Sequence, residues 1–235
     1  QEEIAKAAAH VDAVNPNLSR RSNRAWARRL DLDPAEAAVR EARKVADVVI
    51  VSVQWGGERH AAPTPRQKRI AARLAAAGAD LILGNQLGEL QPIEILRTGG
   101  RKAVVAYSLG SVEGIGGPRY AAELHAVAKA DARDAAALKV NFVKVKIRGR
   151  EIATVIDDVA YEPLWSPTPA KTELATKRFQ PIADVASRAL EQLDSLVESG
   201  AHLREILAAQ EDYRALTLRR ERIEGVLGRV QELNQ

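Results

Sequence analysis

The feature that most constrains the fold is a strand, helix and strand pattern between residues 47 and 84. The run "DVVIVSV" is short, apolar and rich in β-branched residues, as expected for a strand covered on both faces. Thr64, Pro65 and Gln67 form a capping box that begins the helix "RQKRIAARLAAA", and Gly78 ends it before the second buried strand, "DLILG". The pattern predicts a parallel βαβ unit with a right-handed crossover.

Similar signals flank this unit on the N-terminal side. Asp33, Pro34 and Glu36 predict a second capping box, with Asp33 as the N-cap of a helix that runs to about Ala46. The alanine-rich start of the chain predicts a helix, which the loop "NPNLSRRSNRAW" follows.

Strand signals dominate the region that follows. The runs "QPIEIL" and "KAVVAYSL", joined by "RTGGR", predict two strands with a tight connection. The runs "LKVNFVKVKI" and "IATVIDDVAYEPLW", joined by "RGRE", predict a long hairpin with Val143, Val145 and Ile147 on one face. "GIGGP" at residues 114–118 lacks the lysine of a P-loop, so we interpret it as a loop.

The C-terminal part has a helical pattern. Apolar residues recur at helical spacing from Ile182 to Leu196, Gly200 interrupts them, and a second series runs from Leu203 to Val230. We therefore expect residues 182–235 to form two antiparallel helices that pack on the sheet domain or on a second copy. Their deletion should shift the oligomeric state or destabilise the domain.

Composition excludes several classes of function. The chain of 235 residues has no cysteine, which excludes disulfides and thiolate metal sites. Its net charge of +4 is spread along the sequence, so we expect no nucleic-acid partner. No apolar run is long enough for a transmembrane helix. Position 1 is Gln, so we expect that an N-terminal portion, with any signal peptide, has been removed.

Several motifs in register carry a family resemblance. "DVVIVSVQWGGE", "PTPRQKRIAARLAAAGADLILG", "LQPIE" and "AYSLG" resemble, in order and spacing, the CapA/PgsA family of capsule and poly-γ-glutamate synthesis proteins. The resemblance covers residues 35–112, and "VAYEPLW" is similar to a later strand of the family. It implies an α/β fold, the calcineurin-like αββα sandwich of metallophosphoesterases or its C-terminal half, here followed by a helical hairpin. We find no counterpart of the family's N-terminal half, with its metal ligands, in residues 1–34.

The chain departs from the family at the strand ends. Where the family has His-Trp-Gly-x-Glu, this chain has "QWGGE" at residues 54–58, and "GNQLG" at residues 84–88 replaces Gly-His-His-Pro-His. Ser-Leu-Gly-Asn-Phe becomes "SLGSV" at residues 108–112. A dinuclear hydrolytic site needs anionic or imidazole ligands, and the amide oxygens of Gln and Asn are weak ligands for transition metals. We therefore predict no catalytic residue, no metal and no cofactor.

The strand ends after Val53 and Gly84 should still converge on one cleft, because the carboxyl ends of adjacent parallel strands form a crevice. We take as the residues of this degenerate cleft Gln54, Trp55, Glu58, Asn85, Gln86 and Ser108.

Each of these residues has a functional and a purely structural interpretation. The three amides can recognise a glycan or peptide, or be satisfied within their loops, and Trp55 can stack on a sugar or act as a wedge. Glu58 can orient a ligand or be a solvated loop acid, and we favour the latter. We interpret Ser108 as a backbone cap, and His60 as a histidine without a second ligand.

We divide the chain into an N-terminal helical and loop segment (residues 1–34), a CapA-like α/β domain (35–170) and a C-terminal helical segment (171–235). The resemblance implies a non-catalytic binding or scaffolding protein of the cell envelope or extracellular space. Its expected ligand is an anionic polymer, a glycan or a peptide, and its expected partner is a second copy or an envelope protein bound through the helices. One alternative is an active metal-dependent hydrolase with ligands from a missing N-terminal half. Another is a helical interaction module.

Overall fold

The computed structural model describes residues 8–12, 32–55, 62–85, 89–110, 134–148, 150–165 and 179–228. Its first sheet has five strands in the order β1-β2-β3-β5-β4. The strands are β1 (Ala8–Asp12), β2 (Val48–Gln54), β3 (Leu81–Asn85), β4 (Leu90–Thr98) and β5 (Arg101–Leu109). β1, β2, β3 and β5 are parallel, and β4 pairs antiparallel with β5. The predicted βαβ unit and the predicted pair of strands after it are confirmed.

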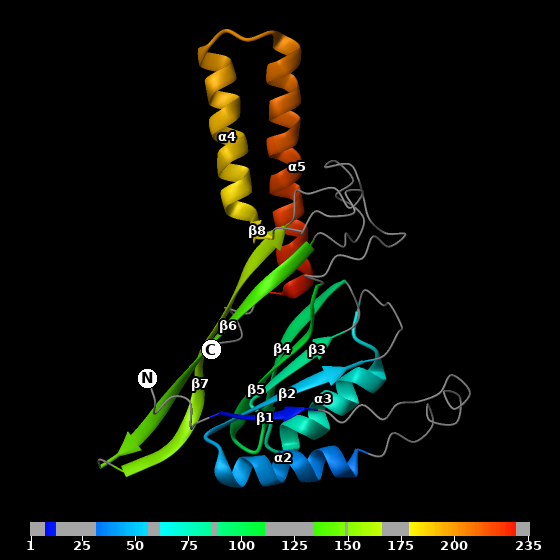
Figure 1. Cartoon of the computed structure of the whole chain (residues 1–235), viewed down its shortest axis with the longest axis vertical. Coiled ribbons are helices and arrows are strands. Elements are labelled where there is room, and N and C mark those ends of the chain that lie inside the picture. The colour runs from blue at the N-terminus through cyan, green and yellow to red at the C-terminus, as the bar shows by residue number, and fades with distance from the viewer. Residues whose placement is uncertain are drawn as a thin grey trace, which may run out of the picture.

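Two helices cover one face of this sheet, α2 (Asp33–Val45) and α3 (Pro65–Ala77) (Figure 1). Alternate residues of each central strand face them, and Val105 of β5 packs with Val39 of α2 and Leu74 of α3. Val104 and its alternating neighbours point to the opposite face, into a second core cluster. This burial on both faces explains why the central strands are continuous apolar runs.

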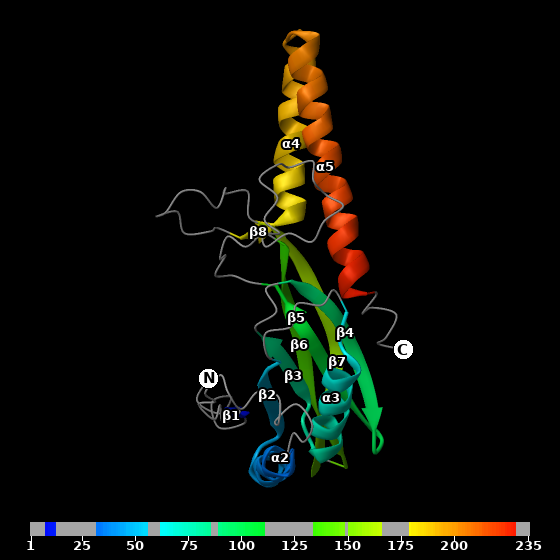
Figure 2. The same ribbon diagram turned by 90° about the vertical axis from the view of Figure 1, so that its right-hand side faces the viewer.

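A three-stranded antiparallel sheet packs on that opposite face (Figure 2). It consists of β6 (Asp134–Ile147), β7 (Arg150–Trp165) and β8 (Gln180–Pro181), and β6 and β7 form the predicted long hairpin. Ile156 and Val159 point inward, toward Val104 and Ile93 of the first sheet. The described residues thus form an α-β-β arrangement, and in this part of the chain no helix covers the outer face of the second sheet.

The C-terminal helices α4 (Ile182–Glu198) and α5 (Leu203–Leu227) form the predicted antiparallel hairpin, with Gly200 at a φ of 68° between them. The hairpin projects from the end of the two sheets, and only its base joins their core (Figures 1 and 2). The α/β fold with a C-terminal helical hairpin is confirmed. Of the described helices, none is long and apolar enough to cross a membrane.

A buried ion pair fixes the base of the hairpin to the second sheet. Arg219 of α5 is fully buried, and its Nη1 donates to Oδ1 of Asp134 at 2.8 Å. Arg222 donates to the other carboxylate oxygen of Asp134 at 2.7 Å, and the guanidinium of Arg219 also lies 5.7 Å from the ring centroid of Trp165. The pair joins residues 85 positions apart in the sequence, which no local pattern predicts.

Two local predictions were wrong. Residues 8–12, expected in a helix, form β1, which pairs in parallel with β2 from Ala8 opposite Val48 onward. The backbone hydrogen bonds offered by the open edge of β2 outweigh the helix propensity of alanine, and they bring part of the predicted N-terminal segment into the sheet.

The N-cap of α2 is Leu32 rather than Asp33, because Asp33 and Glu36 bind Arg73 of α3. The capping box of Thr64 and Gln67 is confirmed.

Candidate functional site

The predicted strand ends lie side by side at one edge of the first sheet. Gln54 at the end of β2 is opposite Asn85 at the end of β3, and Val53 is opposite Gly84. Leu83 of β3 is opposite Ala106 of β5, so Ser108 also lies toward this edge. Of the six predicted site residues, the structure describes Gln54, Trp55, Asn85 and Ser108.

The other predicted positions lie outside the described residues. They are Glu58 and Gln86, and His60, which we interpreted as a histidine without a second ligand, also lies outside the described residues.

Trp55 connects three strands at this edge. Its indole Nε1 donates to the carbonyl oxygen of Tyr107 on β5 at 2.8 Å, and the two ring centroids are 5.9 Å apart. The indole also lies directly over Gly84, where a Cβ atom would be only 1.8 Å from Nε1 and 2.1 Å from the carbonyl oxygen of Tyr107. A glycine at position 84 is therefore a steric requirement for this position of Trp55.

The remaining polar residues of the edge also make contacts within the protein. The side-chain amide of Asn85 donates from Nδ2 to the hydroxyl of Ser52 at 2.9 Å, while Asn85 and Gln54 are both exposed. Ser108 is buried, and its hydroxyl accepts a hydrogen bond from the backbone N–H of Gly110 at 3.4 Å. Of these residues, Gln54 and Asn85 are the ones most accessible to a ligand.

A charged network lies close to the same strands. The Tyr107 hydroxyl donates to Glu94 Oε2 at 3.2 Å, and Lys68 donates to the other carboxylate oxygen of Glu94 at 2.7 Å. Burial raises the pKa of Tyr107 above its ordinary value, and the nearby charge of Glu94 raises this pKa further. The protonated phenol is thus the form that the fold favours.

Among the described residues of this edge, the chemistry available is hydrogen bonding by neutral groups. Amides, a hydroxyl and an indole can recognise a ligand, but they supply neither a strong nucleophile nor anionic metal ligands. In the part of the chain that the structure describes, no group of three or more histidine, aspartate or glutamate side chains could hold a metal ion.

Sequence reasoning missed a buried carboxylate at the opposite end of β3. Asp80 is buried and accepts hydrogen bonds from the backbone N–H of Val49 at 2.8 Å and from Arg43 at 2.6 Å, and it also binds Arg101. These partners come from β2, α2 and β5, so Asp80 joins three elements. The sequence shows only an aspartate before an apolar run, and does not reveal its distant arginines.

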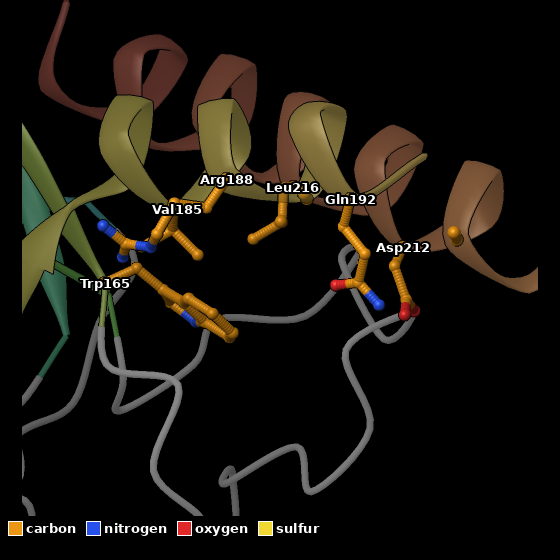
Figure 3. A pocket seen from close by; sticks show the side chains of 8 residues that line it. Trp165, Val185, Arg188, Gln192, Asp212 and Leu216 are labelled. Atoms are coloured by element: carbon orange, nitrogen blue, oxygen red, sulfur yellow. The ribbon is translucent and has the colours of Figure 1, made fainter. Parts of the chain in front are cut away.

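Sequence reasoning also missed a groove at the base of the helical hairpin (Figure 3). The groove has a volume of about 360 Å³ and lies between the end of β7 and the helices α4 and α5. None of the six predicted site residues lines it. Its lining consists of Trp165, Val185, Arg188, Ala189, Gln192, Ala209, Asp212 and Leu216. The helical spacing of Val185, Arg188 and Gln192 shows that they share a face, but not which strand that face meets.

Residues 2–112 match the model of the family described as bacterial capsule synthesis protein PGA_cap. The matched region contains the whole first sheet together with α2 and α3. This segment belongs to the CapA-like capsule synthesis family. The match begins at residue 2, so the similarity to the family extends beyond the resemblance over residues 35–112.

Two curated relatives agree with this assignment. The CapA-like segment resembles the PGA biosynthesis protein CapA of Bacillus subtilis (strain 168), with 40% identity over 73 residues, 31% of this chain and 18% of the relative. It also resembles the capsule biosynthesis protein CapA of Bacillus anthracis, with 38% identity over 66 residues, 28% of this chain and 15% of the relative. The chain thus matches less than a fifth of the length of either relative.

Proposed function

We propose that this chain is a CapA-like protein of capsule or poly-γ-glutamate biosynthesis in the cell envelope, and that it binds or scaffolds rather than hydrolyses. The family membership of residues 2–112 and the names of the two Bacillus relatives support the biosynthetic context. The non-catalytic role depends on the chemistry of the strand ends.

The exposed amides of Gln54 and Asn85, which stand opposite each other where the family has histidines, are the observation that carries this proposal. Trp55 and Gly84 are residues that the family patterns share, and here the indole lies over Gly84 while its N–H joins the end of β2 to β5. Beside it, Asn85 and Gln54 present neutral amides at an exposed edge. Such an edge can bind the amide or hydroxyl groups of a polymer by hydrogen bonds, without the hydroxide that a dinuclear centre would generate.

Titration calorimetry with poly-γ-glutamate tests the binding role. We expect the double variant Gln54→Ala, Asn85→Ala to weaken binding by tenfold or more, about 1.4 kcal/mol, since it removes two amides from the edge. Gln192→Ala is the matched control, because it removes the same group from the groove in Figure 3. Binding that is lost with Gln192→Ala and retained with the double variant would contradict the proposed site.

Metal analysis and a phosphoesterase assay separate this proposal from an active hydrolase. We expect the purified chain to hold no stoichiometric Mn, Fe or Zn and to cleave no generic phosphoester. One or more tightly bound transition metal ions per chain, together with phosphoester hydrolysis, would support a metal-dependent hydrolase instead.

A further inference from the structure

Ser52 of β2, which is not one of the predicted site residues, lies beside Asn85 at the edge of the first sheet. Side chains alternate between the two faces of a strand, so Ser52 and Gln54 share a face, and Asn85 shares it because it is opposite Gln54. Trp55 packs with the core cluster on the other face, which α2 and α3 cover. Ser52, Gln54 and Asn85 therefore form a polar group on the face opposite Trp55.

A hydrogen bond to Ser52 orients the amide of Asn85. Nδ2 of Asn85 donates to Oγ of Ser52 at 2.9 Å, and Asn85 is exposed. A carboxamide is planar, with its oxygen and its nitrogen on opposite branches, so this bond turns Oδ1 away from Ser52. Within the described part of the chain, Oδ1 accepts no hydrogen bond. The edge thus presents a hydrogen-bond acceptor at Asn85.

The position of Ser52 within the strand makes it a suitable group for this task. Ser52 is half-buried in β2, so the sheet holds its short side chain in place. A bond to such a group restricts the rotation of the exposed Asn85 amide before a ligand arrives, and this lowers the entropic cost of binding. Half a turn of the amide would instead present its NH₂ group, which is a donor. Ser52 is therefore a positioning residue that acts through Asn85.

We infer that this edge binds its polymer through the N–H groups of main-chain amides, with the carboxylates of the polymer turned toward solvent. The inference rests on the proposed function and names the groups that the site recognises. An acceptor attracts an N–H donor and repels the oxygens of a carboxylate. Each repeat of poly-γ-glutamate carries an amide N–H in its main chain and a carboxylate beside it, so this polymer can meet both conditions.

Titration calorimetry with three soluble probes tests which groups are recognised. A short γ-linked glutamate oligomer carries both groups, its methyl ester keeps the N–H groups without the charges, and polyacrylate keeps the carboxylates without any N–H group. We expect the ester to bind within about threefold of the free acid. Polyacrylate should bind more weakly by about tenfold or more.

The outcomes separate this inference from the proposed function. An oligomer that binds as the free acid but not as the ester, or polyacrylate that binds as tightly as the oligomer, would overturn the inference and leave the proposed function standing. Dextran offers hydroxyl donors without amides, and tighter binding of dextran than of the ester would assign the edge to a glycan and overturn the inference. A chain that binds no γ-linked oligomer would overturn both.

Ser52→Val and Ser52→Thr form a matched pair, because the two side chains have the same shape and only threonine keeps the hydroxyl. Ser52→Val should weaken binding of the ester by about threefold to tenfold. It should also reduce the preference for the oligomer over polyacrylate, since the freed amide of Asn85 can turn its NH₂ group outward. Ser52→Thr should retain the preference. The same preference in both variants would overturn the positioning role, since a merely structural role of Ser52 would not change it.

Asn85→Asp tests the direction of the hydrogen bond to the ligand. A carboxylate only accepts hydrogen bonds, and those that it accepts are stronger than those of a neutral amide. The variant should therefore bind the ester at least as tightly as the unsubstituted chain, and the free acid more weakly because like charges repel. Loss of ester binding, in a variant whose circular dichroism and melting temperature match those of the unsubstituted chain, would show that Asn85 acts as a donor and would overturn the inference.

Discussion

At Gly84 the backbone of β3 lies so close to the indole of Trp55 that no side chain fits. A methyl group there would overlap both Nε1 of Trp55 and the carbonyl oxygen of Tyr107. We therefore expect Gly84→Ala to displace the indole, break its hydrogen bond and lower the free energy of unfolding by about 3 kcal/mol. Urea unfolding followed by tryptophan fluorescence measures this loss.

Gly225→Ala is the control for that substitution. Gly225 lies within α5, and an added Cβ there would meet no atom within 4 Å. Alanine should stabilise the protein by about 0.4–1 kcal/mol, because it restricts the unfolded chain. Equal effects at positions 84 and 225 would show that the contact with Trp55 has no energetic importance.

Tyr107 makes stability depend on pH in the alkaline range. Burial and then the charge of Glu94 raise its pKa in the folded protein, so the folded state holds the phenolic proton more tightly than the unfolded state. The resulting stability is complete below the ordinary tyrosine pKa of about 10 and is lost as the pH rises above it. We expect the free energy of unfolding to fall less steeply above this pH in Tyr107→Phe than in the unsubstituted chain.

Urea unfolding of both proteins in neutral and alkaline buffer checks this expectation. The deprotonation of lysine affects both proteins alike, so the difference between them isolates Tyr107. Parallel pH profiles would contradict the prediction.

At the scale of the element, two similar sequence motifs had different outcomes. Thr64 and Gln67 form a capping box because both partners belong to one helix turn, and the predicted hydrogen bonds are present. Asp33 and Glu36 have the same spacing, but Arg73 of α3 binds both carboxylates. A local motif is therefore predictable only where no distant charge competes for its side chains.

This difference gives a paired prediction. Thr64→Ala should lower the free energy of unfolding by about 1 kcal/mol, because it removes a side-chain cap. Asp33→Ala should cost no more than about 0.5 kcal/mol, because its ion pair with Arg73 is exposed. Chemical denaturation of the two variants tests the pair, and a larger loss for Asp33→Ala than for Thr64→Ala would contradict it.

The attachment of α5 to the second sheet depends on Asp134. Asp134→Asn removes the charge that faces the buried guanidinium of Arg219, and breaking a buried pair typically costs about 3–5 kcal/mol. Glu224→Gln is the control, since its ion pair with Arg220 is exposed and contributes about 1 kcal/mol or less. Similar melting temperatures for the two variants would argue against a role of Asp134 in holding the helices.

At the scale of the whole molecule, the sequence predicted those parts whose signals are continuous. Buried strands, the β6–β7 hairpin and the two C-terminal helices each follow from apolar runs of the right period. The strand β1, the ion pair of Arg219 with Asp134 and the groove beside Trp165 were not predicted. They depend on contacts between segments far apart in the sequence, such as β1 with β2 or α5 with β6. At the strand ends, the pairing of Gln54 with Asn85 followed from parallel topology, whereas the contact of Trp55 with Gly84 did not.

The helical hairpin itself divides into a base that belongs to the core and a projecting part that does not. Ile182, Leu216, Ile223 and Leu227 are buried in the cluster shared with both sheets, and fully burying each such side chain contributes about 1.5–3 kcal/mol. Their sum is comparable to the whole stability of a domain, about 5–15 kcal/mol. Deleting residues 182–235 should therefore prevent cooperative folding.

Replacing only residues 191–207 with a short Gly/Ser linker should have a different effect, because none of these residues is buried. The truncated chain should keep its cooperative thermal transition, since the base of α4 and α5 still fills the core. Calorimetry of the two truncations distinguishes the cases. If removal of residues 191–207 abolished cooperative unfolding, the projecting part would be required for the fold. If removal of residues 182–235 left the transition unchanged, the base of the hairpin would not be part of the core.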